Sequence, residues 1–248
     1  MDARVRELVK ATIPVLKEHG VALTTYFYQR LFRHNPELKN IFNQSHNETG
    51  KQPVALAMAV LAYAENIDDP SVLAPVITLI ANKHASVGIR AEHYPIVGKH
   101  LLASIREVLG DAASDELIHA WGVAYGALAD VFIEAESKLY NEACNSDGGW
   151  SGWRSFRIID KVRESAEITS FHLVPCDGGP LPSYRAGQYT TVRAFVPELG
   201  VMQLRQYTLS IAPGAMHFRI SVKREPASTT TPAGRVSNRL HDFYKVGD

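Results

Sequence analysis

The stretch ITLIANKHASVGI, which runs from Ile77 to Ile89, places one histidine inside an otherwise apolar helical pattern. Small and apolar residues recur around His84 at steps of three and four, so His84 falls on the face that a helix buries. The members of that stripe are Ile77, Ile80, Ala81, His84 and Gly88. Such a histidine is either a hydrogen-bonded core residue or a metal ligand, and this stretch by itself favours the core residue.

The same helical period continues on both sides of this stretch, from residue 1 to about residue 143. It predicts helices over about 3–18, 21–33, a short segment after Pro36, 51–66, 71–86, 92–109 and 114–141. Pro36, the polar stretch 43–50, Asp68-Asp69-Pro70 and Gly110 supply the breaks. The first half of the chain is therefore predicted to be an all-helical domain.

The pattern changes after NSDGGWSGW, residues 145–153, where alternating apolar and polar residues replace the helical period. The alternating runs are SFRIIDKV, ITSFHLV, QYTTVRAFV, MQLRQYTLSI and MHFRISVKRE. Gly/Pro-rich turns separate them, which is typical of an antiparallel sandwich or barrel, and one short helix is expected over about 236–243. The predicted division is a helical domain over 1–143, a linker over 144–153 and a β-domain over 154–248.

Composition narrows the classes of function. The 248 residues include 26 basic and 26 acidic side chains, without a basic run interleaved with aromatic residues, so nucleic acid is not an expected partner. Apolar runs such as ALAMAVLAYA, residues 55–64, are shorter than the roughly 20 residues of a membrane span, and the N-terminus lacks a signal peptide. These features predict a cytoplasmic protein that is not an integral membrane protein. Cys144 and Cys176 are expected to be reduced thiols.

Three segments of the helical half, FYQRLFRHNPELKNIFN (27–43), IANKHAS (80–86) and WGVAYGALADVF (121–132), resemble the bacterial flavohaemoglobins. The resemblance implies a globin domain that binds haem b, with Phe42 packed against the porphyrin and His84 as the axial iron ligand. It further implies that Glu136 accepts a hydrogen bond from His84 and that Tyr94 holds Glu136. Such a carboxylate makes the imidazole more electron-rich, which favours activation of bound oxygen over storage.

On the other side of the haem, the resemblance assigns Tyr28 to oxygen stabilisation and Gln52 and Leu56 to shaping access. Pro53 is a departure that bears on Gln52, because the residue before a proline is disfavoured in helical conformation. We therefore expect the helix to begin at Pro53 and Gln52 to be displaced or mobile. Lys83 matches the position that the family places between haem and flavin.

In the second half, AGQYTTV (186–192), RQYTLS (205–210) and GRVSN (234–238) match, in order, the motifs of ferredoxin-reductase-type FAD barrels. An arginine for the pyrophosphate, an aromatic ring for the flavin and a helix N-terminus for phosphate are what FAD requires. The positions carried over are Tyr189, Arg205, Gln206, Tyr207, Thr208, Gly234, Val236 and Ser237. Ala186 stands where the family usually has proline, a mild departure.

By resemblance, the chain is a nitric oxide dioxygenase fragment, with O2 and nitric oxide as ligands and a place for a lipid in the distal pocket. In the full-length family NAD(P)H reduces FAD, which reduces haem. The chain ends at KVGD, and we expect its FAD barrel to lack a final strand and the pyridine-nucleotide domain to be missing, so that haem binding survives and FAD binding is weakened. Two other classes stay open: a non-enzymatic oxygen, haem or lipid carrier with a structural β appendage, and a haem-based sensor.

Overall fold

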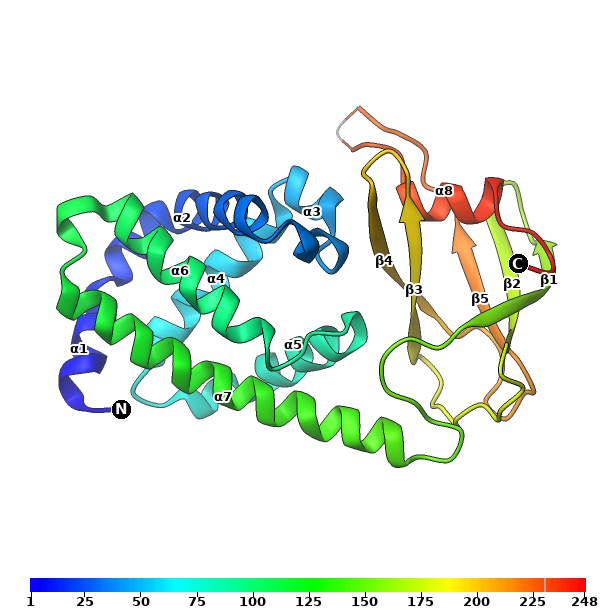
Figure 1. Cartoon of the computed structure of the whole chain (residues 1–248), viewed down its shortest axis with the longest axis horizontal. Coiled ribbons are helices and arrows are strands. Elements are labelled where there is room, and N and C mark those ends of the chain that lie inside the picture. Colours follow the sequence, from blue (N-terminus) through cyan, green and yellow to red (C-terminus); the bar gives the residue numbers. More distant parts are fainter. Residues whose placement is uncertain (230) are drawn as a thin grey trace. The chain divides into compact units, whose positions relative to one another are not determined.

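The computed structural model describes residues 1–229 and 231–248, which form two compact units. Unit 1 is Met1–Ser137 and is helical, whereas unit 2 is Lys138–Asp248 and is built mainly from strands (Figure 1). The two periodicities predicted an all-helical domain followed by an antiparallel β-domain, and the structure has both in this order. The predicted limits of the domains and the linker stay predictions.

Unit 1 contains seven α-helices and three short 3-10 helices in its described residues. The α-helices are α1 (Ala3–Ala11), α2 (Ile13–His34), α3 (Gln44–Glu48), α4 (Lys51–Glu65), α5 (Ala74–Val87), α6 (His93–Leu109) and α7 (Asp115–Asn145), which runs on into unit 2. The 3-10 helices are η1 (Pro36–Asn40), η2 (Pro70–Leu73) and η3 (Gly110–Ala112). The short helix α3 lies within the polar stretch that the sequence predicted to be a break.

The expected break between the first two helices, at residues 18–21, was wrong. The helix instead breaks at Thr12, because Pro14 in the first turn of α2 lacks the N–H that a continuous helix would need. Gly20 lies inside α2, where a Cβ atom would stand 3.5 Å from the Cβ of Ala57 in α4. This glycine marks a close approach of two helices and not the end of one.

The expectation for Gln52 was also wrong in its structural part. Helix α4 begins at Lys51, after Gly50 with φ of 74°, so Gln52 lies within the first helical turn. A first-turn residue has no intrahelical acceptor for its N–H, and Pro53 therefore costs the helix no hydrogen bond. The side chain of Gln52 is fixed by a hydrogen bond with Tyr28 and is not displaced.

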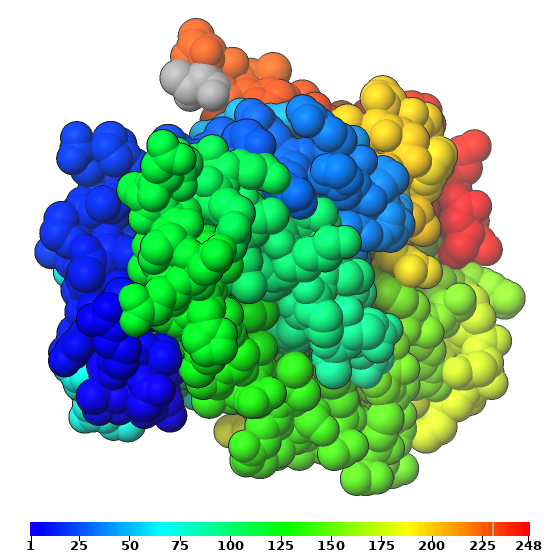
Figure 2. Space-filling view, turned by 60° about the vertical axis from the view of Figure 1, so that its left-hand side comes forward, coloured from blue at the N-terminus to red at the C-terminus, as the bar shows by residue number. Residues whose placement is uncertain are grey.

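The core of unit 1 joins α1, α2, α4, α6 and α7. Its most deeply buried members, all at 1 % exposure or less, are Val9, Phe27, Leu31, Ala64, Ala120 and Ala124. At the rim, Arg4 of α1 forms an ion pair with Glu116 of α7 at 2.7 Å, and Figure 2 shows the blue N-terminal residues against the green ones on this face. The apolar stripes recognised in the sequence are thus buried against one another.

Unit 2 contains five antiparallel strands: β1 (Phe156–Arg163), β2 (Ile168–Pro175), β3 (Tyr189–Val196), β4 (Val201–Thr208) and β5 (Phe218–Lys223). One sheet has the order β1-β2-β5, and β3 pairs with β4 in a second sheet. A bridge between Leu209 and Ile220 connects the β4 side to β5, and no closed barrel is found in the described residues. The free side of β1 is partly covered, because the backbone of Ile158 bonds to Gly247 and Asp248 at 2.8 Å each.

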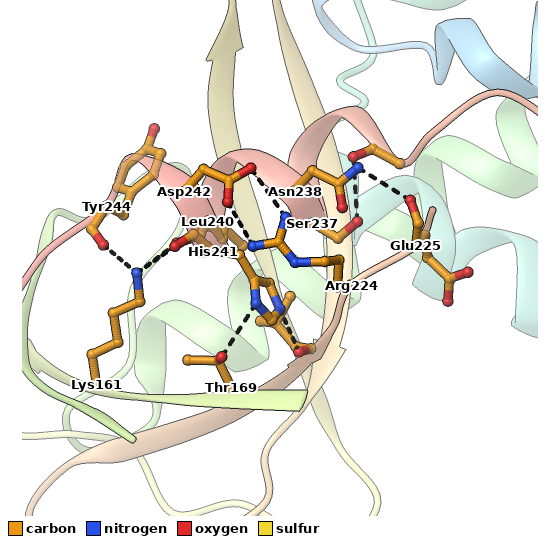
Figure 3. Close-up of polar contacts among 12 residues, drawn as sticks. Lys161, Thr169, Arg224, Glu225, Ser237, Asn238, Leu240, His241, Asp242 and Tyr244 are labelled. Atoms are coloured by element: carbon orange, nitrogen blue, oxygen red, sulfur yellow. Dashed lines mark hydrogen bonds and ion pairs between the residues drawn. The ribbon is translucent and has the colours of Figure 1, made fainter. Parts of the chain in front are cut away.

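Helix α8 (Arg235–Asp242) packs on β3, β4 and β5 and buries Val236 and Leu240 in the core of unit 2. Polar side chains hold it at both ends (Figure 3). The Lys161 ammonium donates to the backbone carbonyls of Leu240, His241 and Tyr244 at 3.3, 2.7 and 2.8 Å. Such a cation at a helix C-terminus satisfies carbonyls that have no helical partner and opposes the helix dipole.

Side chains of α8 itself add two further anchors. Asp242 accepts from both terminal nitrogens of Arg224 at 2.6 and 3.1 Å. His241 donates from Nε2 to the carbonyl of Val222 at 2.9 Å, while its Nδ1 lies 3.2 Å from the hydroxyl of Thr169. The position of α8 is therefore set by the neighbouring strands, and the position of its N-terminus follows from these contacts.

Helix α7 is the one described helix that is long and apolar enough, by length and composition, to cross a membrane. Long core helices of water-soluble domains have the same composition, and α7 buries Trp121, Phe132 and the carboxylate of Glu136 within unit 1. The exclusion of an integral membrane segment stays a prediction. Cys144 and Cys176 are exposed and free, in keeping with the expected thiols.

Candidate haem and flavin sites

His84 lies on α5 and meets side chains from α6 and α7. Its Nδ1 is 2.8 Å from Oε1 of Glu136 and 3.2 Å from the hydroxyl of Tyr94. The Tyr94 hydroxyl donates to the same carboxylate oxygen at 2.5 Å. Because an ionised carboxylate only accepts, the proton of the neutral imidazole is held on Nδ1, and Nε2 is left with its lone pair.

Burial separates the two ends of this cluster. Glu136 is 2 % exposed, whereas the His84 side chain is 33 % exposed. A buried carboxylate needs hydrogen-bond partners, which Tyr94 and His84 supply. The ring of Phe132 lies 5.6 Å from that of His84, centroid to centroid, and limits its rotation from the side of α7.

The donor set around His84 fits haem better than a bare metal ion. No group of three or more His, Cys, Asp or Glu side chains suited to a metal ion occurs in residues 1–229 and 231–248. A protein-held zinc site needs three or four such ligands, whereas a porphyrin supplies four nitrogens and asks the protein for one axial imidazole. One histidine with its second nitrogen held by a carboxylate is what such an iron requires.

Tyr28, Phe42 and Gln52 come together at a second place in unit 1. Tyr28 is 5 % exposed, and the centroid of its ring lies 5.7 Å from that of Phe42 and 5.9 Å from that of Phe32. Burial raises the pKa of Tyr28 to about 12, and the hydrogen bond with Gln52 opposes this rise. At neutral pH the phenol is therefore protonated and remains a hydrogen-bond donor.

Thr24 is a residue of this region that the sequence did not indicate. Its buried hydroxyl lies 2.8 Å from the carbonyl oxygen of Pro53 and 3.0 Å from that of Gly20. The first of these contacts ties the start of α4 to α2, and so holds Gln52 beside Tyr28. A threonine inside a helix usually bonds only to its own helix, so no sequence signal could have revealed the contact across to α4.

Leu56 and Lys83 occupy different environments. Leu56 is half-buried on α4 and packs against the core cluster of unit 1, of which Tyr28 is a member. Lys83 precedes His84 on α5, and its side chain is exposed. An exposed ammonium beside the candidate ligand suits an acidic group at the edge of a cofactor, and it also suits an ordinary surface lysine.

In unit 2, strand pairing brings the two tyrosine motifs side by side. Tyr189 of β3 stands opposite Thr208 of β4, and Thr191 stands opposite Gln206, whose amide nitrogen lies 3.4 Å from the Thr191 hydroxyl. Both Tyr189, at 41 %, and Thr208 are exposed. The end of this hairpin thus exposes an aromatic ring and a hydroxyl, and their contact with a flavin stays a prediction.

Arg205 and Tyr207 project from one face of β4, because strand residues two apart share a face. Burial raises the pKa of Tyr207 to about 12, and burial lowers the pKa of Arg205. The positive charge of Arg235, the first residue of α8, also lowers the pKa of Arg205. Two guanidinium groups therefore act on one region at the start of α8, which favours a bound anion.

The start of α8 fits a phosphate group. Gly234 is the N-cap and provides no side-chain cap, and a Cβ atom there would come within 2.4 Å of Ser237 Oγ. Glycine is thus required by the close approach, and the N-terminal amides are not capped by a side chain. Val236 is fully buried in the core, so it anchors the turn and does not touch a ligand. Arg235, within the GRVSN motif, was not among the predicted positions, although its charge was visible in the motif.

Comparisons with known proteins cover both halves of the chain. Residues 25–132 match the globin family model. Flavohemoproteins of Chromobacterium violaceum and Rhizobium meliloti are 62 % and 55 % identical to the chain over 248 residues. The chain is covered completely in both cases and spans 61 % of the length of these curated relatives.

Two solved structures also match the chain. A flavohemoglobin from Malassezia yamatoensis with bound FAD and heme matches with a TM-score of 0.86 at 27 % identity, covering 100 % of this chain and 62 % of that one. A bacterial globin from Campylobacter jejuni matches with a TM-score of 0.54 at 37 % identity, covering 56 % of this chain and 99 % of that one.

The fold and the histidine site define a globin that is joined to an antiparallel domain of the flavin-binding type. The match covers both halves in a single relative and in the predicted order. The chain belongs to the flavohaemoprotein family.

Proposed function

We propose that this chain carries the haem centre and much of the flavin centre of a nitric oxide dioxygenase, an oxidoreductase that converts nitric oxide and O2 to nitrate. The hydrogen bond from His84 to the buried carboxylate of Glu136 is the observation that carries the proposal. The domain match to a carbene transferase engineered from a Rhodothermus marinus protein, provisionally described as a nitric oxide dioxygenase, also supports it, with 36 % identity and a TM-score of 0.56.

When bound, haem b supplies an iron at which the two gases react, and FAD supplies electrons one at a time. His84 would hold the iron through Nε2, and Phe42 would pack against the porphyrin. Glu136 keeps the Nδ1 proton hydrogen-bonded, which increases electron donation by the imidazole. Tyr94 contributes by fixing the carboxylate that it touches at 2.5 Å.

Tyr28 and Gln52 would form the polar side of the ligand pocket. The phenol of Tyr28 is a protonated donor at neutral pH, so it favours a ligand that carries partial negative charge. Gln52 holds that phenol in place, and Leu56 would restrict the space above the ligand. Lys83 is proposed to face the edge of the haem.

For the flavin, Arg205 and the N-terminus of α8, with Gly234 and Ser237, would hold the pyrophosphate. Tyr189, Tyr207, Gln206 and Thr208 are proposed to line the isoalloxazine, whereas Val236 would contribute packing alone. NAD(P)H is the proposed electron donor of the full-length family. The proposal also includes a lipid in the distal pocket. It further includes a cytoplasmic location and no nucleic-acid partner.

The experiment replaces Tyr28 by Phe in the haem-loaded chain and measures oxygen dissociation by stopped flow. We expect dissociation about ten to a hundred times faster, the equivalent of about 1.4–2.8 kcal/mol of lost hydrogen bonding. Tyr26→Phe is the matched control, because Tyr26 lies two residues away and donates instead to Glu107 at 2.7 Å. Equal rates for Tyr28→Phe and the unaltered chain would contradict the role of Tyr28.

The variant Glu136→Gln distinguishes the proposed enzyme from the alternative of a non-enzymatic carrier. A carrier needs the imidazole only as a ligand, so it would bind oxygen as before after this change, whereas the proposed enzyme should lose nitric oxide turnover. In both cases the iron–imidazole stretching frequency should fall, because the amide is a weaker acceptor than the carboxylate, and this fall checks that the hydrogen bond has been altered. His84→Ala should remove the imidazole signature from the absorption spectrum, and an unaltered spectrum would overturn the assignment of the ligand.

A further inference from the structure

Two histidines of unit 2 meet across strands at a place that the haem and flavin sites do not use. His172 lies on β2, and His217 directly precedes β5, the neighbouring strand in the same sheet. Nδ1 of His172 is 2.9 Å from Nε2 of His217, and the ring centroids are 4.9 Å apart with 37° between the planes. Both side chains are half-buried.

We propose that this pair is a binding site for a divalent transition metal, with copper(II) as the preferred ion. Imidazole nitrogen is a good ligand for copper, nickel and zinc, and copper(II) forms the strongest complexes of the series. Two metal–nitrogen bonds of about 2.0–2.1 Å at a right angle place their nitrogens about 2.9 Å apart, which is the separation found here. Square-planar coordination, which copper(II) favours, has such right angles.

The hydrogen bond of the pair can give way to a metal ion. In the metal-free pair the inner nitrogen of one ring donates its N–H to the inner nitrogen of the other, and two neutral rings can form this contact. A change of tautomer in the donating ring moves its proton to the outer nitrogen and exposes both inner lone pairs, without net release of a proton.

The outer ring nitrogens leave room for this change. Within the described part of the chain, neither Nε2 of His172 nor Nδ1 of His217 has a hydrogen-bond partner. Neither of these two atoms is buried away from solvent. Arg219 is the nearby cation, and its guanidinium is turned to Ser210, where Nε lies 3.2 Å from the hydroxyl. Water can therefore reach the site to complete the coordination.

The site is expected to be weak and exchangeable, because it offers two protein ligands. The described residues contain no cluster of three His, Cys, Asp or Glu side chains, so solvent must fill the other positions. Weak sites of this kind discriminate by the intrinsic order of metals, which places zinc below copper. Metal bound across β2 and β5 also stabilises unit 2, because the unfolded chain does not hold the two rings together.

The test adds one equivalent of copper(II) to the whole chain, loaded with haem, in a buffer with free imidazole, a single-nitrogen ligand that competes with isolated histidines more effectively than with a pair. Electron paramagnetic resonance should show one copper signal with hyperfine splitting from two nitrogens. His172→Gln and His217→Gln should each weaken copper binding at least tenfold, and the double variant should be no weaker than either single one, because each ligand needs the other.

His119→Ala is the matched control, since His119 is an exposed histidine on α7. It should leave the copper affinity unchanged. The proposal would be overturned if His119→Ala weakens copper binding as much as His172→Gln. It would also be overturned if the effects of the two glutamine variants on copper binding add in the double variant, because the pair would then be a hydrogen bond alone. The urea midpoint of each variant without copper shows that loss of binding does not come from unfolding. Copper should raise the midpoint of the unaltered chain and of His119→Ala, and leave those of the glutamine variants unchanged.

Discussion

Replacing Lys161 by Met tests whether the strands fix α8, and with it the proposed phosphate site. Lys161 donates to three carbonyls at the end of α8, at 2.7 to 3.3 Å, and its ammonium lies 5.4 Å from the centroid of Phe171. Hydrogen bonds that involve a charged group contribute about 1.5–3 kcal/mol each, but three to one ammonium do not add. A cation at a helix C-terminus contributes up to about 2 kcal/mol.

We therefore expect Lys161→Met to lower the free energy of unfolding of unit 2 by about 2–4 kcal/mol. Methionine keeps most of the aliphatic stem, so the loss reports the ammonium and not the packing. The assay is urea denaturation followed by tryptophan fluorescence, because unit 2 contains Trp150 and Trp153. The slope with urea should stay constant, which shows that stability and not compactness has changed.

Lys245→Met is the control for this measurement, since it removes the same charge from an exposed position four residues after His241. Exposed substitutions of this kind change stability by at most about 0.5 kcal/mol. If Lys161→Met and Lys245→Met give the same small change, the carbonyl contacts do not hold α8. A large loss of stability for Lys161→Met should also weaken FAD binding, because the N-terminus of α8 would no longer be fixed.

The remaining predictions concern packing and pH. Gly98→Ala should destabilise unit 1 by about 1–3 kcal/mol, because its Cβ would stand 2.5 Å from the ring of Tyr125; Tyr125→Leu in the same chain should relieve part of this loss in a urea titration. Arg154 holds the pKa of Asp177 at about 2, below its ordinary value of 3.8. A lowered folded-state pKa stabilises the fold above pH 3.8, and this contribution disappears as pH falls towards 2. An acid titration of fluorescence should show a shallower loss of stability in that range for Asp177→Asn than for the unaltered chain.

Much of the fold follows from local patterns. The change from a helical to an alternating period near residue 145 was visible without any structure, since each period reports which face of an element is buried. Five strands and the helix over 236–243 were predicted within a few residues, because Gly/Pro turns separate them. The break at Thr12 was missed, since the proline that causes it also suits the first turn of a helix.

The candidate site was less accessible to local reasoning. His84 alone favoured a core residue, and the partnership with Tyr94 and Glu136 came from resemblance. Gln52 was expected to be displaced because Pro53 follows it, yet the contact of Thr24 with the Pro53 carbonyl fixes the start of α4. Such a contact spans 29 residues of sequence and leaves no periodic trace.

The sequence by itself determined the two kinds of domain and their order, because these properties depend on residues that are neighbours along the chain. The positions assigned to cofactors came from resemblance and stay predictions. Tertiary structure alone decided which distant groups meet, as His172 with His217 or Lys161 with the carbonyls of α8. Strand register and helix packing set those meetings, and both arise from the burial of whole faces and not from any single residue.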